Sequence, residues 1–407
     1  MTRQADAPVH VSGGVTAPKG FRAAAVSAGI KKREQPDLVL LVSDAEASVA
    51  GVMTTNRIKA APLLLDQPRI KRGRGRAVVI NSGCANACTG AEGLEDAKEM
   101  IQETARALAL DERDVLVAST GVIGARLPMD RVKAGIIRAA AQLTPSGGPQ
   151  AATAIMTTDT MPKEIAIREA SGRIAITVGG MAKGAGMIHP QMATMLAFIT
   201  TDAAVPSRTL QTLLKRTVAS TFNTIDVDGE TSPNDLVLCF ANGLAKNPPL
   251  TSGAGLAKFE GLLHQVCERL ALMIVRDGEG ANKLVTLRVT GAANAVAAKR
   301  VLEAVARSPL VKTAWHGEDP NWGRTISAIG NAGVPVKPER IALLVGPVAV
   351  VRHGVGLGPS AEAEAAVILK QAEFSVTVDL GQGKGEAIVR TCDLSQEYVR
   401  INAAYRS

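Results

Sequence analysis

The chain has 407 residues, of which 46% are hydrophobic and only 2% aromatic, and its formal net charge is +8. This length allows roughly two or three domains, and the composition predicts a mostly aliphatic, alanine-rich core. A basic cluster at 69–76 contains no aromatic residue that could stack on a base, so it argues against a single-strand nucleic-acid binder and favours a solvated basic loop.

The five cysteines are an odd number and mostly scattered, which predicts reduced thiols rather than a secreted disulfide framework. The pair Cys84 and Cys88 has no partner pair at metal-site spacing, and the acid-rich stretch 226–235 lacks a calcium-loop pattern. Residues 1–14 lack an apolar signal core, and the apolar stretch 341–351 is too short to cross a bilayer. We therefore expect a soluble, cytoplasmic protein with no membrane contact and no metal.

In the first half of the chain, residues up to about 33 are expected to be irregular. Apolar runs and their spacing then predict strands at 38–42, 48–54, 77–80, 114–118, 164–168 and 173–178, the second as partner of the first. Apolar faces at spacings of three and four predict helices over 94–108 and 132–140, and 145–149 is expected to be a loop.

In the second half, strands are predicted at 194–200, 237–240, 284–289, 341–345, 374–378 and 386–390. Helices are predicted at 207–220, with Ser207 as N-cap, and at 256–275, 294–307 and 361–371. Strands and helices alternate along the whole chain, so the predicted fold class is α/β, or mixed α+β, with sheets packed against helices.

One stretch, 179–199, organises the rest. It begins as a glycine-rich loop carrying Lys183 and continues as an apolar strand, with Thr194 where the two meet. Thr194 has two interpretations: a β-branched residue that starts the strand, or a nucleophile freed by cleavage of the Ala193–Thr194 bond, whose own α-amine acts as its base.

Acyl transfer also needs donors that stabilise the oxyanion, and the turn-flanked pair Thr120-Gly121 suits this role, although a plain tight turn explains it equally well. Lys183 could meet a carboxylate and Glu279 an ammonium group; the alternatives are an exposed loop lysine and a solvated turn. No Gly-x-Ser-x-Gly, His-Glu-x-x-His or phosphate-binding loop is present.

Six motifs, spread in order over nearly the whole chain, resemble the self-cleaving ornithine acetyltransferases, which are glutamate N-acetyltransferases of arginine biosynthesis. They are Asn81-Ser82-Gly83-Cys84-Ala85-Asn86-Ala87-Cys88, Ser119-Thr120-Gly121-Val122-Ile123-Gly124, Met156-Thr157-Thr158-Asp159-Thr160, Lys183-Gly184-Ala185-Gly186-Met187-Ile188 with Met192-Ala193-Thr194-Met195-Leu196, Asp319-Pro320-Asn321-Trp322-Gly323-Arg324, and the C-terminal tail.

The resemblance implies a fold of the N-terminal-nucleophile type and cleavage into an α chain of residues 1–193 and a β chain of residues 194–407. It implies Thr194 as nucleophile and Thr120 and Gly121 as the oxyanion hole. The substrate-binding residues that it implies are Thr157, Lys183, Thr194, Glu279, Asn402 and Ser407.

The expected substrates are N2-acetylornithine and glutamate, with acetyl-CoA as a further acetyl donor in some members of the family, no organic cofactor, and an α2β2 heterotetramer. Two rivals remain. An aminopeptidase or amidase with the same kind of nucleophile would pass the acyl group to water. A basic nucleic-acid-binding protein would show salt-dependent retention on DNA.

Overall fold

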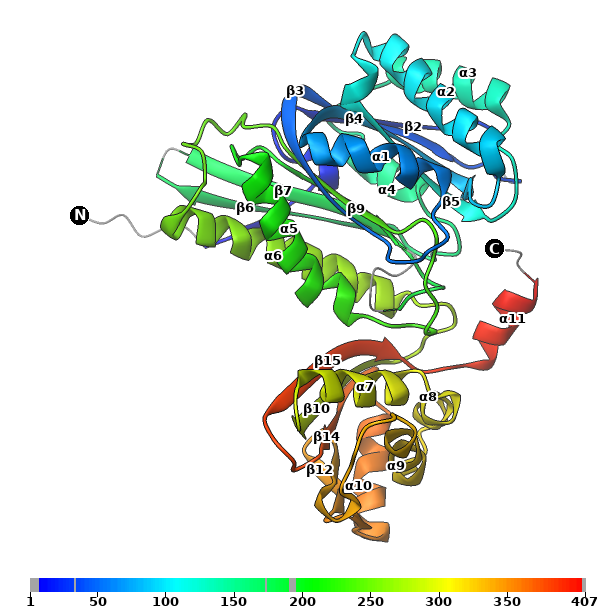
Figure 1. Cartoon of the computed structure of the whole chain (residues 1–407), viewed down its shortest axis with the longest axis vertical. Coiled ribbons are helices and arrows are strands. Elements are labelled where there is room, and N and C mark those ends of the chain that lie inside the picture. The colour runs from blue at the N-terminus through cyan, green and yellow to red at the C-terminus, as the bar shows by residue number, and fades with distance from the viewer. Residues whose placement is uncertain (1–6, 33, 173, 190–194, 405–407) are drawn as a thin grey trace.

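The computed structural model describes residues 7–32, 34–172, 174–189 and 195–404. The chain forms two sheets, each covered by helices (Figure 1), which confirms the predicted mixed α+β class. Ala193, Thr194 and Ser407 lie outside the described residues. The expected boundary between the α and β chains falls between two neighbouring strands of the first sheet, so both chains would contribute to that sheet.

The first sheet runs in the order β1-β6-β7-β8-β9-β3-β4-β5, with β2 paired to β3. Its strands are β1 (Val9–Val11), β2 (Phe21–Val26), β3 (Leu38–Met53), β4 (Arg74–Cys84), β5 (Val115–Val122), β6 (Lys163–Ser171), β7 (Ile174–Lys183), β8 (Leu196–Thr201) and β9 (Leu236–Ala241). Its helices are α1 (Ala61–Arg72), α2 (Gly90–Leu108), α3 (Met129–Ala141), α4 (Gly148–Ala154), α5 (Ser207–Ser220) and α6 (Gly253–Arg276), with 3-10 turns at Gly14–Thr16, Glu112–Asp114 and Phe222–Thr224.

The long strand β3 folds this sheet onto itself. Its residues 38–42 pair with β4, the register then shifts, and its residues 48–53 pair with β9. Because side chains alternate across a strand, Val39 and Leu41 face inward and share one core with Phe198 of β8. The two halves of the sheet therefore form the inner layers of a sandwich.

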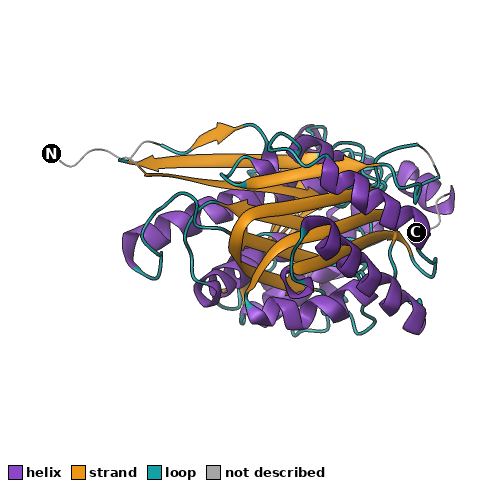
Figure 2. Cartoon of the chain, turned by 90° about the horizontal axis from the view of Figure 1, so that it is seen from above, coloured by secondary structure: helices purple, strands orange, loops and turns teal. Residues whose placement is uncertain are grey.

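Helices cover the two outer faces of this sandwich, with α2 and α3 above the strands and α5 and α6 below them in Figure 1. Figure 2 shows the helices and strands of the chain from above. The alternate residues Leu38 and Leu40 of β3 pack in one core with residues of α2 and α3. On the other side, Ala197 and Ile199 of β8 pack with residues of α5 and α6. The order of layers is thus helix, sheet, sheet, helix.

The second sheet runs in the order β13-β12-β11-β14-β10-β15. Its strands are β10 (Leu284–Ala292), β11 (Ala342–Val345), β12 (Val348–Arg352), β13 (Val355–Gly356), β14 (Glu373–Asp379) and β15 (Gly385–Cys392). The helices α7 (Ala295–Ala306), α8 (Pro309–His316), α9 (Trp322–Gly330) and α10 (Pro359–Leu369), and the 3-10 turn Pro338–Arg340, belong to this region, and α11 (Gln396–Ala404) then leads back to the first sheet (Figure 1).

Several expectations for the N-terminal part were wrong. Residues before 33 include the strands β1 and β2, and 48–54 is not a partner of 38–42 but continues the same strand. The basic cluster is not a loop, because it spans the last turn of α1 and the start of β4. Part of the expected loop 145–149 begins α4, and the N-cap of α5 is Pro206 rather than Ser207.

The glycine-rich stretch was also misassigned, because residues 179–183 belong to strand β7. These glycines serve close packing rather than a turn. A Cβ on Gly179 would lie 2.0 Å from the carbonyl oxygen of Gly14, and one on Gly180 would lie 2.8 Å from Leu270. The loop itself begins only at Gly184, so Lys183 is the last residue of a strand and is fixed by its pairing with Leu196.

Candidate active site

The oxyanion-hole candidates Thr120 and Gly121 lie near the end of β5, where the register with its parallel neighbour β4 shifts at Cys84. Gly121 has a φ of 131°, a conformation that side chains rarely adopt. A Cβ there would lie 2.3 Å from the carbonyl carbon of Gly83. Only glycine therefore fits this position without movement of two strands.

Lys183 brings a buried ammonium group to the same place. Its side chain is 3% exposed, and its Nζ donates to Thr120 Oγ1 over 3.4 Å. Since a hydroxyl can accept and donate at once, Thr120 keeps its own hydrogen for another acceptor. The lysine thus orients the hydroxyl that the sequence singled out.

The charges around Lys183 are mixed. Burial lowers the pKa of Lys183, and the nearby Lys163 acts in the same direction, whereas Asp159, Glu279 and Asp235 raise it. Three carboxylates thus oppose the loss of the proton from this side chain. A buried ammonium group close to a hydroxyl and to carboxylates is a fitting partner for a substrate carboxylate.

Glu279 follows α6 in a turn that is held to the loop after β7. Its N–H donates to the carbonyl of Ala185 over 2.8 Å, and its Oε2 accepts from Asn402 Nδ2 of α11 over 2.8 Å. A Cβ on Gly186 would lie 2.5 Å from the carboxylate of Glu279. Two predicted substrate-binding residues, more than a hundred residues apart in sequence, are thus in direct contact.

These side chains line one pocket of about 150 Å³. Six of the predicted site residues lie on its wall: Thr120, Gly121, Thr157, Lys183, Glu279 and Asn402. They come from β5, the segment before β6, the end of β7, the turn after α6, and α11. The structure therefore brings together every predicted site residue that it describes.

The segment that follows the expected cleavage position starts beside this pocket. Met195, which is covalently bonded to Thr194, donates its N–H to Asp235 Oδ1 over 3.1 Å, and Leu196 pairs with Lys183. Asp235 is fully buried, and burial raises its pKa well above the usual value. Its other oxygen, Oδ2, has no hydrogen-bond partner among the described residues.

Among the pocket residues that the sequence did not predict are Asp228 and Tyr398. Asp228 accepts from the N–H groups of Met187 (2.6 Å) and Ile188 (2.9 Å) and from the Tyr398 hydroxyl (3.2 Å). Burial raises the pKa of Asp228 to about 6. Asp228 also accepts from the Glu230 N–H within its own acid-rich stretch, but its bonds to Met187 and Ile188 hold the loop ahead of the expected cleavage position.

His189, in the loop after β7, is buried, and its Nδ1 lies 2.8 Å from Asp226 Oδ1. In the described part of the chain, no group of three or more His, Cys, Asp or Glu side chains is placed to hold a metal ion. Likewise, none of the helices described is both long and apolar enough to cross a membrane.

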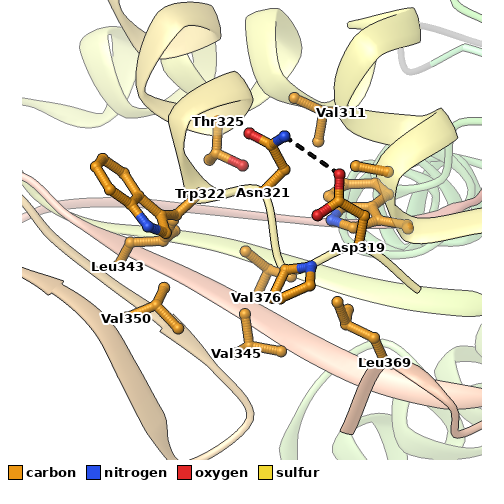
Figure 3. A pocket seen from close by; sticks show the side chains of 13 residues that line it. Val311, Asp319, Asn321, Trp322, Thr325, Leu343, Val345, Val350, Leu369 and Val376 are labelled. Atoms are coloured by element: carbon orange, nitrogen blue, oxygen red, sulfur yellow. Dashed lines mark hydrogen bonds between the residues drawn. The ribbon is translucent and has the colours of Figure 1, made fainter. Parts of the chain in front are cut away.

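The motif 319–324 lies apart from this pocket, in the second region. Asp319, Asn321 and Trp322 line a small cavity together with aliphatic side chains such as Leu343 (Figure 3). The volume of this cavity is about 20 Å³. None of its lining residues is shared with the pocket at Lys183. The motif therefore packs α9 onto the second sheet.

Comparison with known proteins gives a consistent result. The model of the ArgJ family matches residues 22–407. The arginine biosynthesis bifunctional protein ArgJ of Geobacter sulfurreducens is 51% identical over 390 residues, covering 96% of this chain and 99% of the relative. The protein of the same name from Symbiobacterium thermophilum is 50% identical over 400 residues, covering 98% and 99%.

Two solved structures are also similar. The crystal structure of ArgJ from Bacillus halodurans is 44% identical, with a TM-score of 0.48, and covers 51% of this chain and 98% of its own. The structure of ornithine acetyltransferase in complex with ornithine, from Mycobacterium tuberculosis, is 42% identical, with a TM-score of 0.43, and covers 46% and 100%.

Proposed function

The chain belongs to the ArgJ family, and from that premise we propose that it moves an acetyl group from N2-acetylornithine to glutamate through an acetyl-threonine at Thr194. It is an acetyltransferase of arginine biosynthesis, like the relatives it matches over nearly their whole length. The proposal concerns the route of the acetyl group and the side chains that handle it.

The nucleophile becomes available when the chain cuts itself. The Thr194 hydroxyl attacks the carbonyl carbon of Ala193, the peptide nitrogen leaves as the α-amine of Thr194, and water hydrolyses the resulting ester. The freed amine, with a reference pKa of about 8, then serves as the base for the same hydroxyl. Residues 1–193 and 194–407 remain together because the first sheet needs strands from both.

Thr120 and Gly121 stabilise the tetrahedral intermediate in this scheme. The Thr120 hydroxyl accepts from Lys183 and donates to the oxyanion, and the Gly121 N–H supplies the second donor. The support for these roles is the tight fit of Gly121 against β4 and the opening of both residues to the pocket. Donors fixed in this way need no rearrangement as charge develops on the oxygen.

The observation that carries the proposal is the pair of opposite charges in the same pocket, Lys183 and Glu279, beside the oxyanion-hole candidates. An ornithine derivative has a carboxylate for the lysine and a side-chain ammonium for the glutamate. Asn402 fixes the Glu279 carboxylate, and Thr157 adds a hydroxyl to the pocket wall. An enzyme that passes acyl groups to water needs no such matched pair.

The scheme uses no organic cofactor and no metal, because threonine supplies both nucleophile and base. Acetyl-CoA is a candidate second donor, since the relatives are named bifunctional. We expect two copies of each chain in the assembled enzyme, as the family resemblance implied, and a native mass measurement tests this. The cytoplasm is the expected compartment, in keeping with the five free cysteines.

The test is transfer of labelled acetyl from N2-acetylornithine to glutamate by purified protein, with Thr194→Ala as the control. We expect the wild type to form N-acetylglutamate and ornithine in equal amounts, and Thr194→Ala to stay uncut and inactive. Release of free acetate without N-acetylglutamate would favour the amidase instead. A parallel assay with acetyl-CoA and glutamate decides whether the second donor is used.

A further inference from the structure

A second lysine, Lys163, lies behind the pocket and does not line it. It is the first residue of β6 and is 1% exposed. Its Nζ lies between two buried carboxylates, 2.7 Å from Asp159 Oδ1 and 2.5 Å from Asp277 Oδ2. We call Asp159, Lys163 and Asp277 the Lys163 cluster. Burying three charges together lowers the stability of the fold unless each charge is fully paired. A buried cluster of this kind is therefore a candidate for a functional role.

Asp159 connects the cluster to two substrate-site segments. Its Oδ1 accepts from the N–H of Gly184 over 2.7 Å, and its Oδ2 accepts from the N–H of Thr157 over 2.9 Å. Gly184 directly follows Lys183, and Thr157 is itself a pocket residue. Although burial acts in the opposite direction, Lys183 and Lys163 lower the pKa of Asp159 to about 2. The carboxylate therefore stays ionised and holds both backbone segments.

Asp277 connects the cluster to the turn that carries Glu279. Its carboxylate accepts from the N–H of Thr160 (3.0 Å to Oδ2) and from the Thr160 hydroxyl, besides the Lys163 ammonium. It stands two residues before Glu279, whose N–H is bonded to Ala185. The position of Glu279 thus depends on Asp277 on one side and on the loop after β7 on the other.

From this geometry we infer that Lys163 is a positioning residue that sets the spacing between Lys183 and Glu279, and with it the length of amino acid that the pocket accepts. The inference rests on the proposed function. Lys163 belongs to 1–193 and Asp277 to 194–407. After the expected cut, this buried ion pair would therefore join the two chains next to Lys183 and Glu279, the residues proposed to bind the substrate charges.

Removal of the ammonium group predicts a distinctive pH dependence. In Lys163→Met, Asp159 and Asp277 face each other without a cation between them, and they repel when both are ionised. The other charges coupled to this region are Lys31, Lys183, Asp235 and Glu279. The repulsion is strongest where both carboxylates are ionised, so the two side chains move apart and the site loosens as the pH rises.

A matched control is available in the second region. Lys312 is also buried, at 3% exposure, and donates to Thr391 Oγ1 over 2.9 Å, away from the pocket. Lys163→Met and Lys312→Met remove the same group from equally buried places. Lys163→Arg keeps the charge but replaces the compact ammonium with a broader planar group.

The experiment measures KM for N2-acetylornithine and for glutamate, and the single-turnover acetylation rate at saturation, between about pH 6 and about pH 8. For Lys163→Met we expect both KM values to rise about tenfold or more and to rise further with pH, with a much smaller change in the saturated rate. Lys163→Arg should raise KM without the pH dependence, and Lys312→Met should leave KM unchanged.

Unchanged KM values in Lys163→Met, or the same pH-independent loss in Lys163→Met and Lys312→Met, would overturn the inference. If Lys163→Met does not fold, unchanged KM values in Lys163→Arg would overturn it as well. A wild type that transfers no acetyl group would contradict the proposed function instead, and the spacing would then be tested by comparing ornithine binding to wild type and variants by calorimetry.

Discussion

The two sheets differ in what they bury. The second sheet has a single, mostly aliphatic core with one aromatic pair, Trp315 and Phe374, and its strand β14 alternates regularly between buried and partly exposed residues after its exposed first residue. The first region buries many ionisable groups, among them Asp66, Asp159, Lys163, Lys183, Asp202, Asp226 and Asp235, whereas the second buries few, namely Lys283, Lys312 and Asp393. Burying charges lowers stability unless they are paired. From this contrast we infer that the proposed reaction site belongs to the first sheet and that the second sheet serves mainly for packing.

Glycine substitution should give the largest effect and the sharpest contrast. Gly121→Ala must place a Cβ 2.3 Å from the Gly83 carbonyl carbon, so it should displace the oxyanion donors and reduce turnover by about a hundredfold to a thousandfold. Gly330→Ala, at the end of α9, meets no atom within 4 Å and should leave turnover unchanged. Steady-state kinetics of the two variants test this. Equal turnover in both would mean that Gly121 does not contribute to the oxyanion hole.

Loss of the Thr120 hydroxyl should have the second-largest effect on activity. Thr120→Ala should slow acetylation of Thr194 by about a hundredfold, with a smaller change in KM, because the donor acts on charge that appears in the transition state. Thr120→Ser keeps the hydroxyl and should be mild. Single-turnover acetylation in already cut protein separates this effect from maturation, and a wild-type rate in Thr120→Ala would mean that the hydroxyl is no donor.

The pocket charges should discriminate between the two substrates. Glu279→Gln should raise KM for N2-acetylornithine by about ten- to a hundredfold, as for loss of a charged hydrogen bond, and should affect glutamate less, since glutamate has no side-chain ammonium. Lys183→Met should weaken the binding of both substrates, because each carries a carboxylate. Separate KM values for the two substrates test this, and equal changes for both in Glu279→Gln would refute the assignment.

A core substitution in the second region should have the smallest effect on catalysis. Leu287 of β10 is fully buried, and Leu287→Ala should lower the free energy of unfolding by about 2–5 kcal/mol. Turnover of the folded enzyme should stay close to wild type. Denaturant unfolding together with kinetics at low temperature measures both quantities, and a large loss of turnover with native folding would show that the second region shapes the pocket.

The same difference between the two regions explains which strands and helices could be predicted from the sequence. In the second region, the strands predicted at 284–289, 374–378 and 386–390 are confirmed because apolar alternation decides them. In the first region, β3 was divided in two, since Asp44 and Glu46 in its middle are charged and exposed where the register with β4 shifts. Helix α1 was missed because Pro62 and Pro68 lie within it, one in its first turn and one in its interior.

For the site, the family resemblance pointed to six described residues that line the pocket, but not to the groups that hold them. Sequence analysis singled out neither Lys163 nor Asp277, because nothing in the local sequence indicates that a lysine of β6 contacts a carboxylate more than a hundred residues later. Asp228 bonds Met187 and Tyr398 through tertiary contacts in the same way. Family motifs identify residues of a reaction, whereas positioning residues become visible only when the chain is folded.

The central claim is that an acetyl group from N2-acetylornithine is carried on Thr194 of a cut chain. The most direct test is the intact mass of purified protein mixed with N2-acetylornithine in the absence of glutamate. The account predicts two chains, residues 1–193 and 194–407, with the second heavier by one acetyl group at its N-terminal threonine, and loss of that group when glutamate is added. A single uncut chain that still produces N-acetylglutamate, or acetyl found on another residue, would contradict it.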